Sequence, residues 1–162
     1  MKTTLNSEIN NIEDKWDGLS ILTLNQQNRI GFKHLLCRIT NYTDILVGKD
    51  TTYKTYYAPT VKQFEIEHLW TNKFEEYRDE FDQESDFKRW RNLIGALILL
   101  PQGTNQSFGS DKYVDKLRHY IRENTYAQTL HPMFYEKNPN FASSEKAVQI
   151  GFQAHPQMKK RI

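Results

Sequence analysis

The sequence lacks the features that mark a secreted or membrane-spanning chain. Cys37 is the one cysteine among 162 residues, so no intramolecular disulfide can form, which fits a reducing compartment. No apolar run approaches the roughly 20 residues of a membrane-spanning helix, and the longest, at residues 93–101, contains Gly95. The first residues lead into a polar stretch without the hydrophobic segment of a signal peptide. These absences predict a soluble cytoplasmic protein that has no membrane partner.

Several catalytic signatures are also missing from the sequence. It has no glycine-rich loop of the nucleotide-binding type, no paired cysteines of a zinc site and no Gly-x-Ser-x-Gly turn of a serine hydrolase. Cys37 lies in an apolar pattern of helical spacing, which favours a place in the core over a role as a nucleophile. These absences argue against a nucleotide-binding protein, a zinc protein with paired cysteines and a serine hydrolase.

Charge is unevenly distributed along a chain whose net charge is only +2. Residues 64–100 hold five basic and nine acidic side chains, whereas residues 101–162 hold nine basic and five acidic ones. An acidic middle beside a basic C-terminal third suits a metal site next to a phosphate-binding surface. Ordinary solvated helix faces give the same pattern, so charge alone leaves both interpretations open.

Apolar periodicity predicts several helices. The expected helices cover residues 19–47, 72–92 (as one or two helices, with Ser85 as a possible cap), 111–124 and 145–152, with a further short element in 125–142. Residues 1–18 are polar, with few apolar anchors, and are predicted to form a flexible N-terminal segment. The remaining residues, 19–162, are predicted to form one domain.

Two strands are predicted among these helices. Residues 64–70 alternate apolar and polar side chains, which is the period of a half-buried strand. Residues 93–100 form a compact apolar run typical of a buried strand. Residues 49–63 are predicted as a loop or irregular strand, and residues 101–110 as a loop, because of their composition. The order strand, insertion, strand, loop, helix is the one that a ββα-metal core needs.

The pair Glu67-His68 is the sharpest local feature of the sequence. Hydrolysis of a phosphodiester needs a water molecule deprotonated near neutral pH and a partner for the developing negative charge. A histidine beside a divalent cation supplies both. A carboxylate next to the histidine can ligate a hard cation. A hydrogen-bonded structural histidine on a strand is the competing interpretation of an isolated Glu-His pair.

Polar residues after the second predicted strand can complete such a site. Asn105 precedes a helix, and its amide oxygen can ligate a metal or orient a histidine ring, although a turn or a helix cap is the alternative. Lys112 and Lys116 lie about one turn apart on that helix, with Arg118 nearby, and such a helix can bind a DNA backbone. A solvated helix face accounts for the same residues.

Taken together, the motifs resemble one nuclease family. The segments that carry the resemblance are Glu65-Ile66-Glu67-His68-Leu69-Trp70, residues 91–101, Asn105-Gln106-Ser107-Phe108-Gly109 and Lys116. They are similar to the C-terminal nuclease domain of GmrSD-type modification-dependent restriction enzymes, which are HNH, or ββα-metal, nucleases. The resemblance covers residues 30–142. It implies an α+β fold, a mostly helical domain around a small ββα-metal core of the His-Me finger type.

The resemblance also implies roles for individual residues. His68 is expected to be the general base that activates water, and Glu67 to bind a divalent metal ion, Mg²⁺ or Mn²⁺, directly or through water. Asn105 takes the place of the last HNH residue, which is a metal ligand or an organiser of the site. Lys116 matches a family lysine that contacts the scissile phosphate or has a structural role.

The sequence departs from the family pattern at Ala96. Many family members carry an asparagine directly after the glycine of the second strand, where it holds the active-site loop and orients the base. Asn92, four residues earlier, is a candidate to replace it and is counted among the expected catalytic residues. Ala96 therefore affects the catalytic activity that is expected of the chain, but not its resemblance to the family.

Three functions are consistent with these features. The first is a DNA endonuclease that nicks or cuts with little sequence preference, as the effector of an antiphage restriction system. In the family, and in phosphorothioate-sensing defence proteins of the same layout, an N-terminal sensing and nucleotide-hydrolysing domain precedes the nuclease, and it is the expected partner in a parent protein. The second is a catalytically impaired module that only binds DNA. The third is a domain that docks on a protein partner through its aromatic side chains.

Overall fold

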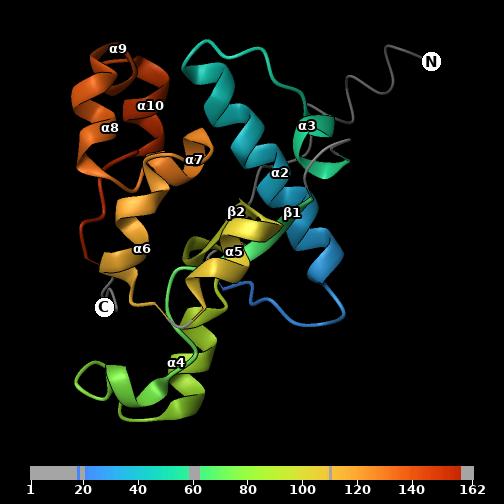
Figure 1. The fold of residues 1–162 in the computed structure, drawn as a ribbon, viewed down its shortest axis with the longest axis vertical. Helices are drawn as coiled ribbons and strands as arrows, with labels where there is room; N and C mark the ends of the chain where they lie inside the picture. Colours follow the sequence, from blue (N-terminus) through green and yellow to red (C-terminus); the bar gives the residue numbers. More distant parts are fainter. Residues whose placement is uncertain (1–17, 19–20, 59–62, 110, 158–162) are drawn as a thin grey trace.

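The structure is a computed structural model that describes residues 18, 21–58, 63–109 and 111–157. The predicted flexible segment at residues 1–18 lies outside the described residues except for Gly18. The described part is mostly helical with a small antiparallel sheet (Figure 1), which agrees with the predicted α+β class. Among the helices of these ranges, none is long and apolar enough to cross a membrane.

The sheet determines where the candidate residues point. Its two strands, which pair antiparallel, are β1 (Phe64–His68) and β2 (Leu97–Pro101). Successive side chains of a strand point to opposite faces of the sheet, and directly paired residues share a face. His68 is paired with Leu97, and Glu67 with Ile98. His68 and Glu67 therefore lie on opposite faces.

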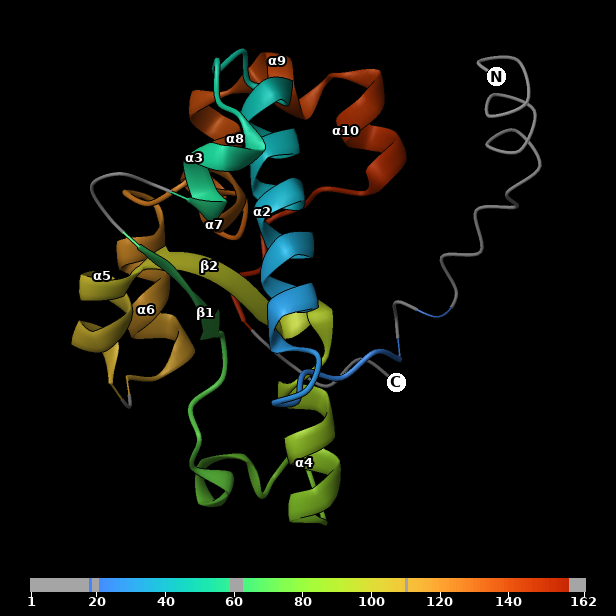
Figure 2. The same ribbon diagram turned by 90° about the vertical axis from the view of Figure 1, so that its right-hand side faces the viewer.

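Helices cover both faces of the sheet. They are α2 (Arg29–Leu46) on one face, and α5 (Gln102–Phe108) and α6 (Tyr113–Tyr120) on the other. Figure 2 shows α2 to one side of the strands and α5 and α6 to the other side. Leu97 and Leu99 of β2 pack with Leu36 of α2, whereas Ile98 and Leu100 pack with the side chains of α6. Because β2 faces a core on each side, it is apolar along its whole length.

The other helices surround this centre (Figure 1). They are α3 (Tyr53–Tyr57), the 3-10 helices η2 (Phe74–Tyr77) and η3 (Ile94–Ala96), α4 (Glu84–Arg91), α7 (Thr125–Gln128), α8 (Pro132–Lys137), α9 (Pro139–Ala142) and α10 (Glu145–Ile150). The insertion between the strands, with η2 and α4, packs around Trp70, Phe81 and Phe87. Helices α8 to α10 pack around Phe134 and Phe141.

The first predicted loop contains a helix. Within residues 49–63, α3 begins after Thr52, whose N–H donates to the hydroxyl of Thr55 at 3.1 Å and so satisfies a donor at the start of the helix. Tyr56 is buried and anchors the helix in the core. A local cap and one buried ring therefore suffice for a short helix, and the predicted loop or irregular strand is wrong here.

The second predicted loop also contains a helix. Within residues 101–110, Pro101 ends β2 and α5 begins at the next residue. Phe108, at the end of α5, packs in the core with the side chains of α6, and this tertiary contact overrides the turn-forming composition. The strand predicted at residues 93–100 is also displaced, because η3 takes up its first part and β2 begins only at Leu97.

A buried carboxylate ties three helices together. Asp44 of α2 accepts hydrogen bonds from the hydroxyls of Tyr56 on α3, of Thr125 on α7 and of Thr51, the last at 2.9 Å. The Lys49 ammonium lies 3.7 Å from the same carboxylate. A buried charge is tolerated when it is paired and hydrogen-bonded in this way. The network holds α3 and α7 against α2.

We expect Asp44→Ala to lower the free energy of unfolding by about 3 kcal/mol, because it leaves buried hydroxyls without their acceptor. Urea unfolding followed by circular dichroism measures the change. Asp50→Ala is the matched control, since Asp50 is an exposed acid close by in the sequence, and it should change stability by less than about 0.5 kcal/mol. Equal stability of the two variants contradicts the role given to Asp44.

Candidate active site

His68 ends β1 on the face of the sheet that α2 covers. Its Nε2 atom lies 2.9 Å from Oδ1 of Asn92, and Nδ2 of Asn92 donates to the Lys88 carbonyl at 2.8 Å. The second contact orients the amide so that its oxygen faces the imidazole. Because an amide oxygen only accepts, Nε2 carries the proton and Nδ1 holds the lone pair. In the part of the chain that the structure describes, no hydrogen bond engages Nδ1.

The end of α4 positions Asn92. Asn92 is the C-terminal cap of this helix, and its carbonyl accepts the Leu24 N–H at 2.8 Å. Arg91, the residue before it, donates through Nε to the carbonyls of Trp70 and Thr71 at 3.1 and 2.9 Å. The end of α4 is thereby joined to the chain that follows β1. Sequence reasoning named Asn92 and missed Arg91, whose available signal was its place beside Asn92 in the second motif.

The imidazole of His68 is held in its neutral form. Burial lowers its pKa to about 4, and the positive charge of Arg91 adds to this effect. Arg29 of α2 and Lys116 of α6 lower the pKa further, while the hydrogen bond to Asn92 opposes the shift. The ring is therefore neutral at neutral pH, which is the form that can accept a proton. The same three cations attract an anionic group such as a phosphodiester.

Glu67 and Lys116 form a buried ion pair on the other face of the sheet. The Nζ atom of Lys116 lies 2.5 Å from Oε1 of Glu67 and also donates to the carbonyl of His68 at 3.0 Å. Burial raises the pKa of the Glu67 carboxyl above its usual value, and the Lys116 ammonium opposes this shift. A lysine thus neutralises the carboxylate that was predicted to bind a metal. Oε1 of Glu67 can ligate a cation only when Lys116 releases it.

Asn105 lies on α5, on the same side of the sheet as Glu67. Its Nδ2 atom donates to Oε2 of Glu65 at 3.2 Å. Glu65 and Glu67 are two residues apart on β1 and share a face, while His68 points to the opposite face. The structure therefore brings Asn92 to His68 and Asn105 to Glu65. It does not bring His68, Glu67 and Asn105 to a common point.

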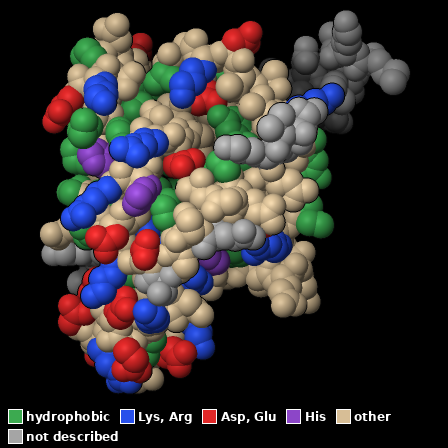
Figure 3. Space-filling view, viewed as in Figure 1, with side chains coloured by type: hydrophobic (Ala, Val, Ile, Leu, Met, Phe, Trp, Pro, Cys, Tyr) green, Lys and Arg blue, Asp and Glu red, His purple; other side chains and the backbone are tan. Residues whose placement is uncertain are grey.

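Helix α6, which was predicted to bind DNA, turns one of its lysines inward. The buried side of the helix consists of Tyr113, Lys116, Leu117 and Tyr120. Lys112 and Arg118 are exposed, so Lys116 does not share their surface and has a structural place instead. Asp115 is also exposed on α6. Figure 3 shows acidic and basic side chains intermixed over one face of the molecule, most densely at the α4 end, so no patch of one sign marks a DNA surface there.

The comparison with known families decides the class of protein. Residues 6–139 match the family described as GmrSD restriction endonucleases, C-terminal domain. The chain belongs to this family. Searches of curated proteins and of solved structures returned no significant match. Membership confirms the resemblance carried by the motifs at residues 65–70 and 91–101, and it implies a nuclease function of the restriction-endonuclease type, with DNA as the substrate.

In this GmrSD C-terminal domain, Ala96 is the position at which the sequence was expected to depart from the family pattern. Ala96 ends η3 and precedes β2, and its carbonyl accepts the Leu69 N–H at 2.9 Å. Its side chain is buried. Asn92 brings an amide to His68 from a different element, the end of α4. The amide that contacts the imidazole in this structure therefore belongs to a helix cap.

The candidate donors of this domain do not form a metal centre as they are arranged. Across the described ranges, no group of three or more His, Cys, Asp or Glu side chains lies close enough to hold a metal ion. Glu67 is paired with Lys116, and His68 and Asn105 lie on opposite faces of the sheet. The predicted Mg²⁺ or Mn²⁺ site therefore does not fit these residues in this conformation.

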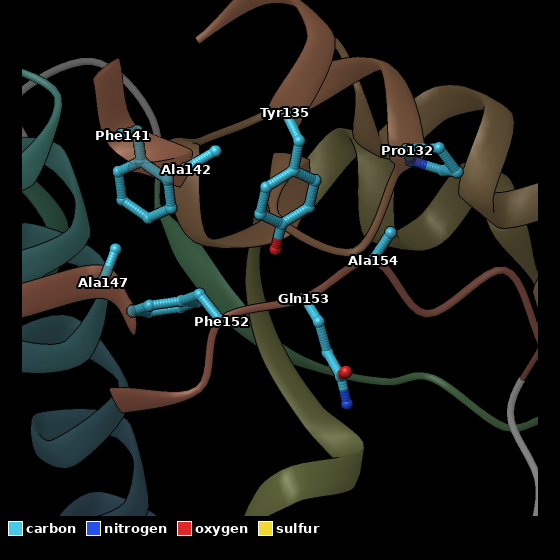
Figure 4. Close-up of a pocket in the computed structure, with 8 residues that line it drawn as sticks. All are labelled: Pro132, Tyr135, Phe141, Ala142, Ala147, Phe152, Gln153 and Ala154. Atoms are coloured by element: carbon cyan, nitrogen blue, oxygen red, sulfur yellow. The ribbon is translucent and has the colours of Figure 1, made fainter. Parts of the chain in front are cut away.

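A cavity of about 390 Å³ is formed by residues of α8, α9, α10 and the chain that follows (Figure 4). Its aromatic lining consists of Tyr135, Phe141 and Phe152, and Figure 4 shows Gln153 directed away from these rings. Among the described residues that line it, there is no histidine, acid or lysine. The cavity therefore offers no general base and does not compete with His68 as the place of the chemistry.

We expect Lys116→Met to lower the free energy of unfolding by about 3–5 kcal/mol, because it leaves the Glu67 charge buried and unpaired. The double variant Glu67→Gln/Lys116→Met should recover much of this loss, since no uncompensated charge remains. Urea unfolding of the wild type, both single variants and the double variant measures the coupling. A coupling energy near zero would show that the two charges do not depend on each other.

We expect His68 to titrate with a pKa of about 4 in the metal-free domain and to carry its neutral-state proton on Nε2. Because folding lowers this pKa from 6.5, the stability linked to neutral His68 is present above about pH 6.5 and is lost as the pH falls towards 4. Nitrogen-15 NMR of the ring reports both the pKa and the protonated atom.

Two variants serve as comparisons in the NMR experiment. Asn92→Ala removes the acceptor of the Nε2 proton and should weaken the preference for one tautomer. Asn140→Ala changes an exposed asparagine of α9 and should leave the ring signals as in the wild type. A His68 ring that titrates near 6.5 contradicts the buried, cation-flanked environment described above.

Proposed function

We propose that this domain is an HNH-type endonuclease that hydrolyses DNA phosphodiester bonds with little sequence preference. The observation that carries the proposal is the state of His68, whose imidazole is neutral, held in one tautomer by Asn92 and flanked by cations. A neutral imidazole can act as a general base, and positive surroundings favour an anionic substrate. The chain order β1, β2, α5 also supports an HNH core.

In the proposed reaction, Nδ1 of His68 accepts a proton from water. The water oxygen attacks phosphorus, one P–O ester bond breaks, and the leaving oxygen takes a proton from solvent. Asn92 keeps the proton on Nε2, so Nδ1 is the atom that accepts the proton from water. The amide oxygen of Asn92 also stabilises the imidazolium that forms. Asn92 is therefore a positioning residue. Asn105 has an organising role in this proposal, through its contact with Glu65.

Negative charge that develops on the phosphate needs a cationic partner. Arg29 is exposed at the start of α2 and acts electrostatically on His68, and Arg91 lies half-buried at the end of α4. Guanidinium groups bind phosphate oxygens in a defined geometry, so these two are the proposed phosphate contacts. Lys112, which directly precedes α6, and Arg118 of α6 are both exposed and are proposed to bind the DNA backbone further away.

A divalent cation, Mg²⁺ or Mn²⁺, is part of the proposal because ββα-metal nucleases use one. As arranged, the described residues do not form its site. Glu67 and Asn105 have the ligand chemistry that such a cation needs. Glu67 becomes available to a cation when its contact with Lys116 is broken.

A module that binds DNA without cutting it is the second candidate function. Ala96 favours this candidate, because it removes the amide that the family pattern places next to β2. The contact of Asn92 with His68 favours catalysis instead. In either case we propose a role in antiviral defence within a parent protein, where an N-terminal sensing and nucleotide-hydrolysing domain directs this domain to its DNA.

We expect His68→Ala to slow the nicking of supercoiled plasmid by at least about 100-fold, because it removes the general base. Asn92→Ala should slow it by about 10-fold or more, since the base is retained and its orientation is not. Gel electrophoresis of plasmid over time, with Mg²⁺, with Mn²⁺ and with EDTA, measures the rates.

His131→Asn is the matched control for the nicking assay. It removes an imidazole elsewhere in the chain, and asparagine preserves a cap at the start of α8, so activity should stay at the wild-type level. A folded His68→Ala variant that nicks at the wild-type rate removes His68 from the mechanism. Equal nicking rates in EDTA and in Mg²⁺ would show that the reaction does not need the cation. DNA binding by a wild type that does not nick supports the second candidate.

A further inference from the structure

We propose that α2 and α3 carry a stacking platform for an unstacked base of a DNA strand. The platform consists of His34, Tyr53 and Tyr57, with Arg38 at its side. It rests on the proposed function only in taking DNA as the ligand. Sequence reasoning placed the DNA surface on α6 and gave no role to these residues.

The three rings of the platform form two layers. His34 and Tyr53 are parallel within 7°, with ring centroids 5.8 Å apart, and a hydrogen bond joins Nδ1 of His34 to the hydroxyl of Tyr53. Because this bond connects the edges of the rings, the two lie side by side. Tyr57 stacks on His34 with centroids 4.2 Å apart and lies 5.3 Å from Tyr53. The Arg38 guanidinium lies 5.6 Å from the centroid of Tyr53.

Tyr53 and Tyr56 anchor α3 against the core, whereas Tyr57 is not among the residues that pack there. Tyr56, which lies between the two stacked tyrosines in the sequence, is buried, and its hydroxyl donates to Asp44. Tyr57, in contrast, is 38% exposed, and Ile30, one turn before His34 on α2, is 71% exposed. A preorganised aromatic surface that is open to solvent can stack any of the four bases, because every base has a π-face.

Basic side chains outnumber acidic ones on the elements that carry the platform. Those of α2 and α3 are Arg29, Lys33, Arg38 and Lys54, while Lys49, between the two helices, pairs with Asp44. The acids of the same stretch are Asp44, which is buried in its network, and Asp50, which is exposed. Cations beside exposed rings supply the two kinds of contact, to phosphate and to base, that hold single-stranded DNA without sequence preference.

The platform lies on the same side of the sheet as His68. Helix α2 covers the face on which His68 lies, and α3 packs on α2 (Figure 2). Arg29, at the start of α2, acts electrostatically on His68. His34 lies five residues further on, about 7.5 Å along the helix axis. The platform and His68 thus belong to the same face of the sheet.

The test measures DNA binding without cleavage. The full chain carrying His68→Ala is titrated in EDTA with a single-stranded oligonucleotide that contains 2-aminopurine, whose fluorescence falls when the base is stacked. Tyr57→Leu should weaken binding by about 10-fold and abolish the quenching, whereas Tyr57→Phe, which keeps the ring, should bind within about twofold of its parent. Lys33→Gln with Arg38→Gln should reduce the slope of log Kd against log salt by about 1.4, or about 0.7 for each lost phosphate contact.

Tyr42→Leu is the matched control for the platform. Tyr42 is 42% exposed on α2 and lies outside the stack, so its loss should leave the quenching unchanged. Unchanged affinity and quenching in a folded Tyr57→Leu variant overturn the platform and leave a protein partner as the occupant of this surface. If the wild type nicks plasmid and the Tyr57→Leu variant still binds the oligonucleotide normally, the platform is contradicted and the proposed function is not. If Tyr57→Leu weakens binding and the wild type does not nick, the proposed function is contradicted and the platform is not.

Discussion

The pairing of β1 with β2 sets the place of every candidate residue. Because side chains alternate along β1, His68 points towards α2 and Glu67, its neighbour, towards α6. A shift of the register by one residue would exchange these faces and place a carboxylate against the aliphatic side chains of α2. The residues of β2 oppose such a shift, since Leu97 and Leu99 fill one core while Ile98 and Leu100 fill the other. Hydrophobic packing on both faces therefore fixes the register of the strands, and the register places His68 and Glu67.

Lys116 connects the two faces of the sheet. Its ammonium binds the Glu67 carboxylate on one face and the carbonyl of His68 at the end of β1. The cation that neutralises Glu67 thus also contributes to the positive surroundings that keep His68 neutral. The ammonium is thus the positive charge that balances the Glu67 carboxylate in this structure. The stability of the core and the protonation state of His68 depend on the same charge.

Local patterns predicted those parts of the structure that local interactions determine. Alternation identified β1, and the family motifs pointed to His68 and Asn92, but the contact between these two depends on how α4 packs, which no local pattern encodes. Helical spacing put Lys112 and Lys116 on a common side of α6 without indicating which side is buried, and Lys116 found a carboxylate from another element. The turn-forming composition before α6 concealed α5, because a distant core contact of Phe108 stabilises that helix.

The position of Asn92 makes the proposed base dependent on the insertion between the strands. Both atoms of its amide are satisfied, Oδ1 by His68 and Nδ2 by the Lys88 carbonyl, so the amide cannot turn without losing a hydrogen bond. Arg91, one residue earlier, is bound to the chain after β1 and lowers the pKa of the same ring. A displacement of α4 therefore moves the partner of Nε2 together with the charge that lowers the pKa of His68 most. The end of this helix thus fixes the tautomer of His68 and contributes to its pKa, which gives the insertion a part in the proposed chemistry.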